Sequence, residues 1–185
     1  MKTVFLPVLL LSCALSPFSP AQTCREVVRD ASGRVVQTID RQKSASGTVQ
    51  ATTRDASGRI IGTATTNPNA GGSAQTYYRD ASGKLTGTAT TQPTAGVSSR
   101  ATYRDASGRL AGSADTRTGH GSGTSTQYRD ASGRLTGRQT TNTSPSGSFT
   151  GTQRDASGRL TGGSTGSGKC QRTAVVPASP PGLKK

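Results

Sequence analysis

The stretch YRDASGRL, residues 103–110, carries the pattern that decides the fold. Its central part, Arg-Asp-Ala-Ser-Gly followed by Arg or Lys, occurs six times, with the aspartate at Asp30, Asp55, Asp80, Asp105, Asp130 and Asp155. Every interval is 25 residues. A period held through six copies without an insertion indicates a repeated structural unit that stacks on, or pairs with, the next one.

Each copy contains the residues of a tight turn. The Asp side chain can accept hydrogen bonds from backbone N–H groups further round the turn, and the Gly suits a left-handed conformation that other residues resist. An aliphatic residue follows the Asp by five positions, as Val35, Ile60, Leu85, Leu110, Leu135 and Leu160. A variable stretch rich in Pro, Gly, Asn and Ser then separates most copies. One repeat therefore predicts a strand, a tight turn, a second strand and a looser turn.

The length of the tight loop sets the register of each hairpin. We expect a four-residue Asp-Ala-Ser-Gly loop, because it places the two flanking Arg residues opposite each other and Tyr103 opposite Leu110. Gly112 and Ala114 then share the face of Tyr103, while Arg and Thr side chains lie on the other face. A three-residue loop would instead pair the Asp with the second Arg and separate Tyr from Leu.

The composition argues against an ordinary enzyme domain. The chain has 185 residues, a formal net charge of +14, 29% hydrophobic residues and no Trp. From Gln22 onward it holds only 17 Leu, Ile, Val and Phe residues, which is too few for a conventional core. The single histidine, His120, lies in a Gly-rich stretch, and the acidic residues outside the turns have no spacing suited to a metal or to paired carboxylates. We therefore expect a non-enzymatic protein without cofactor or metal.

The chain divides into three segments. Residues 1–21 resemble a bacterial secretory signal, too short to span a membrane, which predicts a secreted or periplasmic protein. The repeat domain is expected over residues 22–170, and the Pro-containing basic segment 171–185 is expected to be disordered. Cys13 lies inside the signal, and we do not expect it to be a lipid-anchoring site, because the signal before it would be unusually short.

Two cysteines flank the repeats, Cys24 before the first and Cys170 after the last. An even pair in an exported chain predicts a disulfide, with free thiols or an intermolecular bond as the alternatives. In an all-β, up-and-down meander of six hairpins, both cysteines lie at the edge opposite the tight turns. A disulfide between them favours a closed or flattened barrel over an open β-solenoid, whose ends would lie far apart.

The candidate binding residues are the cations that flank each turn: Arg29, Arg34, Arg54, Arg59, Arg79, Lys84, Arg104, Arg109, Arg129, Arg134, Arg154 and Arg159. A row of them along one rim would attract an anionic surface polymer such as lipopolysaccharide or an acidic glycan, which predicts an adhesion or binding scaffold. The alternative is a solvated basic edge that prevents aggregation. Nucleic acid is disfavoured because only three copies carry Tyr beside the Arg. A second candidate function is self-assembly into a matrix or amyloid-like fibre through the Thr-, Ser- and Gln-rich strands.

The motif of residues 103–110 resembles the bacterial YD (Rhs-type) repeat, in which Tyr-Asp-x-x-Gly-Arg-Leu forms a hairpin. The resemblance covers residues 25–165 in six copies, and the Gly-Arg-Leu half carries most of it. The chain departs from that family by the Arg between Tyr and Asp and by its longer period. The resemblance implies an exported β-scaffold, in some members associated with carbohydrate binding or surface contact. It does not imply an activity for this chain.

Overall fold

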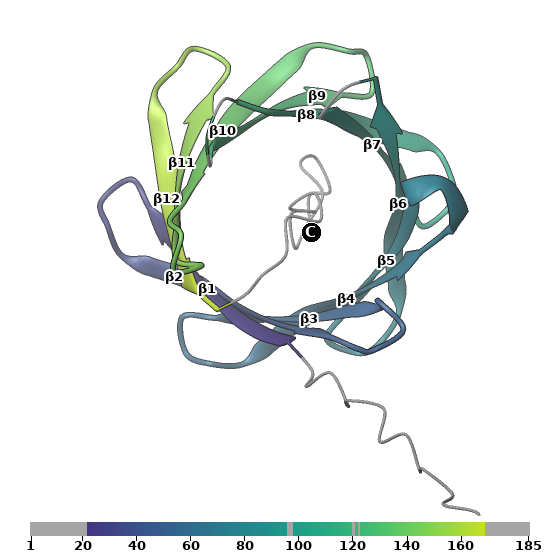
Figure 1. The fold of residues 1–185 in the computed structure, drawn as a ribbon, viewed down its shortest axis with the longest axis horizontal. Helices are drawn as coiled ribbons and strands as arrows, with labels where there is room; N and C mark the ends of the chain where they lie inside the picture. Colours follow the sequence, from purple (N-terminus) through teal and green to yellow (C-terminus); the bar gives the residue numbers. More distant parts are fainter. Residues whose placement is uncertain (1–21, 96–97, 120, 122, 169–185) are drawn as a thin grey trace, which may run out of the picture.

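The protein is a closed barrel of twelve antiparallel strands in the computed structural model, which describes residues 22–95, 98–119, 121 and 123–168 (Figure 1). The strands are β1 (Gln22–Asp30), β2 (Val35–Lys43), β3 (Val49–Asp55), β4 (Ile60–Pro68), β5 (Ala74–Asp80), β6 (Leu85–Thr94), β7 (Ser98–Asp105), β8 (Leu110–Thr118), β9 (Gly123–Asp130), β10 (Leu135–Thr143), β11 (Phe149–Asp155) and β12 (Leu160–Ser167). A short 3-10 helix, η1 (Ala70–Gly72), connects β4 to β5. The all-β closed barrel is confirmed, and the solenoid alternative is wrong.

Each strand pairs with its neighbours in the chain, and β1 pairs with β12 to close the ring. Because the strands alternate in direction, the six Asp-Ala-Ser-Gly turns lie together at one rim. The other connections lie at the opposite rim, beside the start of β1 and the end of β12. Figure 1 views the barrel through its ring of strands and shows hairpin loops that project outward, such as the purple loop between β1 and β2.

The register of the hairpins differs from the four-residue loop expected above, and that expectation is wrong. The backbone N–H of Asp105 donates to the carbonyl of Arg109 over 2.9 Å, and Gly108 donates to Asp105 over 3.0 Å. These bonds define a three-residue loop with Gly108 at φ +84°, a turn whose twist suits the flanking strands. The same pair of bonds occurs in all six turns.

A second irregularity follows each turn and decides which side chains face inward. Arg104 pairs with Leu110, but Tyr103 pairs with Gly112, so one extra residue of β8 lies between the two pairs as a β-bulge. The bulge brings Gly112 opposite the buried Tyr103, and Leu110 is left 46% exposed. Tyr and Leu are therefore separated, whereas Gly112 and Ala114 lie on the face of Tyr103 as expected.

The buried core consists mainly of small residues and tyrosine, with few large aliphatic side chains. The core cluster contains Tyr78 and Tyr103 with the alanines Ala64, Ala89, Ala101 and Ala114. Among the described residues, Val28 and Ile39 are the fully buried members of the Leu, Ile, Val and Phe set. Burial raises the pKa of the Tyr78 and Tyr103 phenols, because the charged form would lose its hydration.

Polar pairs complete the interior. Arg41 of β2 donates to Glu26 of β1 over 2.7 Å, with the Glu26 side chain only 4% exposed. The Tyr128 hydroxyl donates to Oε1 of Gln139 over 2.7 Å. These contacts satisfy groups whose burial without a partner would cost free energy.

The glycines that lie seven positions after the turn aspartate allow neighbouring hairpins to approach closely. A Cβ at Gly62 would lie 2.8 Å from the carbonyl oxygen of Arg79, and one at Gly137 would lie 2.7 Å from that of Arg154. The contact recurs where the ring closes, because Gly162 lies against the carbonyl oxygen of Arg29. The Gly at this position thus gives the next hairpin room to approach, although the first copy has Gln37 at the same place, where β2 pairs with β3.

Several expectations fall outside the described residues. They concern the signal over residues 1–21 with Cys13, His120, Cys170 and the tail over residues 171–185. In the part of the chain that the structure describes, no helix has the length and apolar character needed to cross a membrane.

Candidate functional site

Each turn on the basic rim is organised by one carboxylate oxygen. Oδ1 of Asp105 accepts three hydrogen bonds: from the Ser107 backbone over 2.9 Å, the Ser107 hydroxyl over 2.7 Å and the Arg109 backbone over 2.9 Å. The other five turns contain the same three bonds. The turn therefore has one rigid shape that occurs six times around the rim.

These hydrogen bonds lower the pKa of the turn carboxyls. For Asp105 the largest cause is the Ser107 hydroxyl, and the backbone N–H of Arg109 adds to it, while the positive charge of Arg109 contributes less. The pKa is lowered in the same way at Asp30, Asp55, Asp80, Asp130 and Asp155. All six carboxyls are consequently ionised at neutral pH.

The first cation of each turn has a structural partner. The Arg104 guanidinium donates to the carbonyl oxygen of Gly108 over 2.9 Å, across its own turn. The corresponding bond occurs at Arg29, Arg54, Arg79, Arg129 and Arg154. These six arginines fasten the loop to the strand that enters it, so only part of their hydrogen-bonding capacity remains for a ligand.

The second cation of each turn faces solvent. Arg109 is exposed, and neither a hydrogen bond nor an ion pair joins its side chain to another described residue. The same holds for Arg34, Arg59, Lys84, Arg134 and Arg159. The rim carries twelve cations against six turn carboxylates, an excess of six positive charges. The structure thus brings all the sequence-predicted cations to one rim. Six of them donate a hydrogen bond to their own turn, and the other six face solvent.

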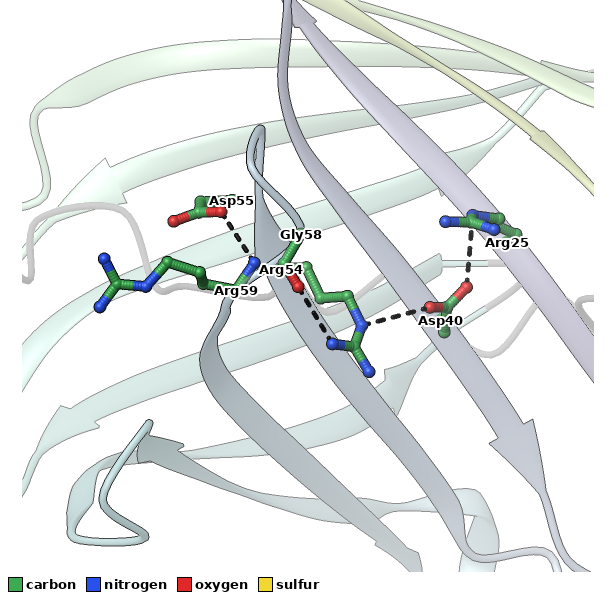
Figure 2. Close-up of polar contacts among 6 residues, drawn as sticks. All are labelled: Arg25, Asp40, Arg54, Asp55, Gly58 and Arg59. Carbon is green, nitrogen blue, oxygen red and sulfur yellow. Dashed lines mark hydrogen bonds and ion pairs between the residues drawn. The ribbon is translucent and has the colours of Figure 1, made fainter.

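A polar groove of about 620 Å³ is lined by residues of β1, β2 and β3 together with Ser167 and Gly168 at the end of β12. Figure 2 shows Asp40 between Arg25 and Arg54, at 3.5 Å and 4.0 Å, with Arg54 also bonded to its turn glycine. Because the two arginines share one carboxylate, the groove offers less unpaired charge than the rim. Sequence reasoning missed this network, since Arg25 and Asp40 become neighbours only through the register of β1 and β2.

The aliphatic residue that follows each turn was also misplaced by sequence reasoning. Ile60, Leu110 and Leu160 are 44%, 46% and 48% exposed, and each pairs across the hairpin with the first cation of its turn. The other three, Val35, Leu85 and Leu135, are half-buried. Each turn therefore presents an aliphatic side chain together with its two cations.

Other candidate chemistry is sparse in the described ranges. They contain no group of three or more His, Cys, Asp or Glu residues placed to hold a metal ion. Asp115, an acid outside the turns, is occupied by a paired contact with Arg100 at 2.7 Å and 3.2 Å, which lowers the Asp115 pKa. The six exposed second cations of the rim are thus the candidate binding groups that the described residues offer.

No protein-family model matches the chain, and no curated protein is significantly similar to it. The resemblance of the turn motif to the YD repeat stays a prediction.

Proposed function

We propose that the protein is a non-enzymatic, exported binding scaffold whose basic rim holds an anionic surface polymer, lipopolysaccharide or an acidic glycan. The observation that carries the proposal is the set of six exposed second cations, one per turn. The turns fix their backbone positions, so binding loses little backbone entropy. Six equal contacts on one ring also favour a ligand with many charges over one with a single charge.

Export and a disulfide between Cys24 and Cys170 form part of this proposal. Cys24 lies in β1, and β1 pairs with the last strand. A Cβ placed on Gly168 would lie 3.0 Å from the Cβ of Cys24, which supports a bond from Cys24 to a cysteine two residues further along the chain. Such a bond would lock the two strands that close the ring, in an oxidising compartment.

Self-assembly through strand edges is less well supported. Each of the twelve described strands is paired on both sides, so the barrel offers no free edge for a second copy. The six exposed cations also repel an identical rim.

The test is heparin binding by a variant in which the six second cations become glutamine: R34Q, R59Q, K84Q, R109Q, R134Q and R159Q. We expect heparin affinity at low salt to fall by about tenfold or more, with a weaker dependence on salt, because fewer counterions are released. Purified lipopolysaccharide serves as a second probe. Unchanged affinity for both probes would show that the rim is not the binding site.

A pair of single variants separates rim charge from total charge. R109Q and R117Q remove one charge each at opposite ends of β8, and both side chains are exposed. Only R109Q is expected to weaken heparin binding. Equal losses in the two variants would indicate attraction by net charge and contradict a rim site.

A further inference from the structure

The exposed aliphatic side chains beside the turns are unexpected in a chain so poor in them. Six of the 17 Leu, Ile, Val and Phe residues from Gln22 onward follow a turn at the same position. Ile60, Leu110 and Leu160 are close to half exposed, while the interior is built from Tyr, Ala, Thr and Gly. Packing of the core therefore does not explain why this position is aliphatic in every copy.

The environment of these residues is equally regular. Leu110 pairs across the hairpin with Arg104, so the aliphatic side chain and the first cation of the turn lie on the same face. The same pairing joins Ile60 to Arg54 and Leu160 to Arg154. A single exposed leucine on a protein surface is ordinary. Three exposed aliphatic residues, each paired with a cation at the same rim, form a patterned surface, and apolar surfaces of this kind mark interaction sites.

Two ligand classes would use such a rim differently. A soluble acidic glycan needs the cations but gives aliphatic side chains nothing apolar to contact. A lipid surface with anionic headgroups offers phosphates to the cations and, immediately below them, the apolar boundary of the acyl chains. The combination of the two residue types favours the lipid surface.

We propose that the rim docks on a membrane surface of anionic lipid, with the exposed cations on the headgroup phosphates and the exposed aliphatic residues against the apolar boundary of the acyl chains. This inference rests on the proposed function and narrows its ligand from an anionic surface polymer in general to one that carries lipid. It assigns a role to a residue position that the core does not use.

The experiment compares the exported, processed protein with a triple variant, I60S/L110S/L160S. Both are sedimented with vesicles of equimolar phosphatidylglycerol and phosphatidylcholine, and their heparin affinity is measured in parallel. We expect the variant to lose about tenfold or more in vesicle partitioning, because three apolar contacts are removed, with heparin affinity unchanged within about twofold. Wild-type protein is expected to leave pure phosphatidylcholine vesicles unbound.

The control variant T90S/T140S/T152S changes three exposed threonines of the strands and is expected to partition as wild type. Thermal melts monitored by circular dichroism verify that both variants fold. Unchanged vesicle partitioning of the aliphatic variant would overturn the lipid inference. If the wild type bound heparin but not the vesicles, the lipid inference would be overturned in favour of a glycan. If the wild type bound neither heparin nor the vesicles, the proposed function would fail as well.

Discussion

At the scale of single residues, the rim shows how one sequence motif assigns different tasks to similar side chains. Asp105 accepts three bonds inside the turn, Arg104 fastens the turn to its strand, and Arg109 is left in solvent. The two arginines look equivalent in the sequence. Their difference arises from the three-residue loop, which places only the first guanidinium within reach of the Gly108 carbonyl.

The serine of the turn is predicted to control the acid sensitivity of its aspartate. Removing the Ser107 hydroxyl in Ser107→Ala takes away the largest cause of the lowered pKa, so the pKa of Asp105 should rise toward its ordinary value. Carboxyl resonances followed by NMR during a pH titration measure this directly. Ser113→Ala, on β8 away from the turn, is the control and should leave the Asp105 pKa unchanged.

The sign of the pH effect on stability follows from the direction of these shifts. Because the folded pKa of the six carboxyls is lowered, their stabilisation is complete above the ordinary carboxyl range and is lost as pH falls through the lowered values. The melting temperature of the wild type should therefore fall in acid. A variant with all six turn serines replaced by alanine should show a shallower fall, and an equally steep fall would contradict the role of the hydroxyls.

At the scale of strands and hairpins, the bulge after each turn determines the face on which every later side chain lies. In β8 the extra residue turns Gly112 inward opposite Tyr103, and Leu110 stays beside Arg104. The sequence predicts the hairpins, their turn position and the inward Gly and Ala. It does not predict the register, because an apolar pair of Tyr and Leu is a reasonable expectation until the bulge and the hydrogen bonds of the turn are known.

A methyl group at the close approach between hairpins is predicted to destabilise the barrel. In Gly137→Ala the new Cβ would lie 2.7 Å from the backbone oxygen of Arg154, so one strand must shift. We expect a loss of about 1–3 kcal/mol in the free energy of unfolding, measured with urea. The neighbouring exposed change Thr136→Ala is the control, with an effect within about 0.5 kcal/mol. Equal stabilities of the two variants would show that the close approach relaxes freely.

At the scale of the whole molecule, closure compensates for the small number of large apolar side chains. Each described strand is hydrogen-bonded on both sides, and β1 with β12 completes the ring. The two cysteines that flank the 25-residue repeats predict this closure from the sequence. The composition of the interior was harder to predict, because tyrosine, alanine and the Glu26–Arg41 ion pair occupy places that a conventional core gives to leucine and valine.

Opening the ring is predicted to convert the protein into a self-associating one. A chain ending at Ser144 lacks β11 and β12, so β1 and β10 each gain a free edge that can pair with another copy. Light scattering after size exclusion should show oligomers, and thioflavin fluorescence should rise over days. The full-length C24S/C170S variant separates loss of the hairpin from loss of the disulfide. A truncated chain that stays monomeric would contradict this account of closure.

The glycine contact between hairpins has a consequence for how the gene can change. Gly137 lies against the carbonyl of Arg154, and Gly162, at the closing seam, lies in the same way against that of Arg29. A duplication or deletion of 25 codons would therefore join surfaces that already fit. Each such event would change the circumference by two strands and the number of exposed second cations by one, so ring size and ligand valence would evolve together.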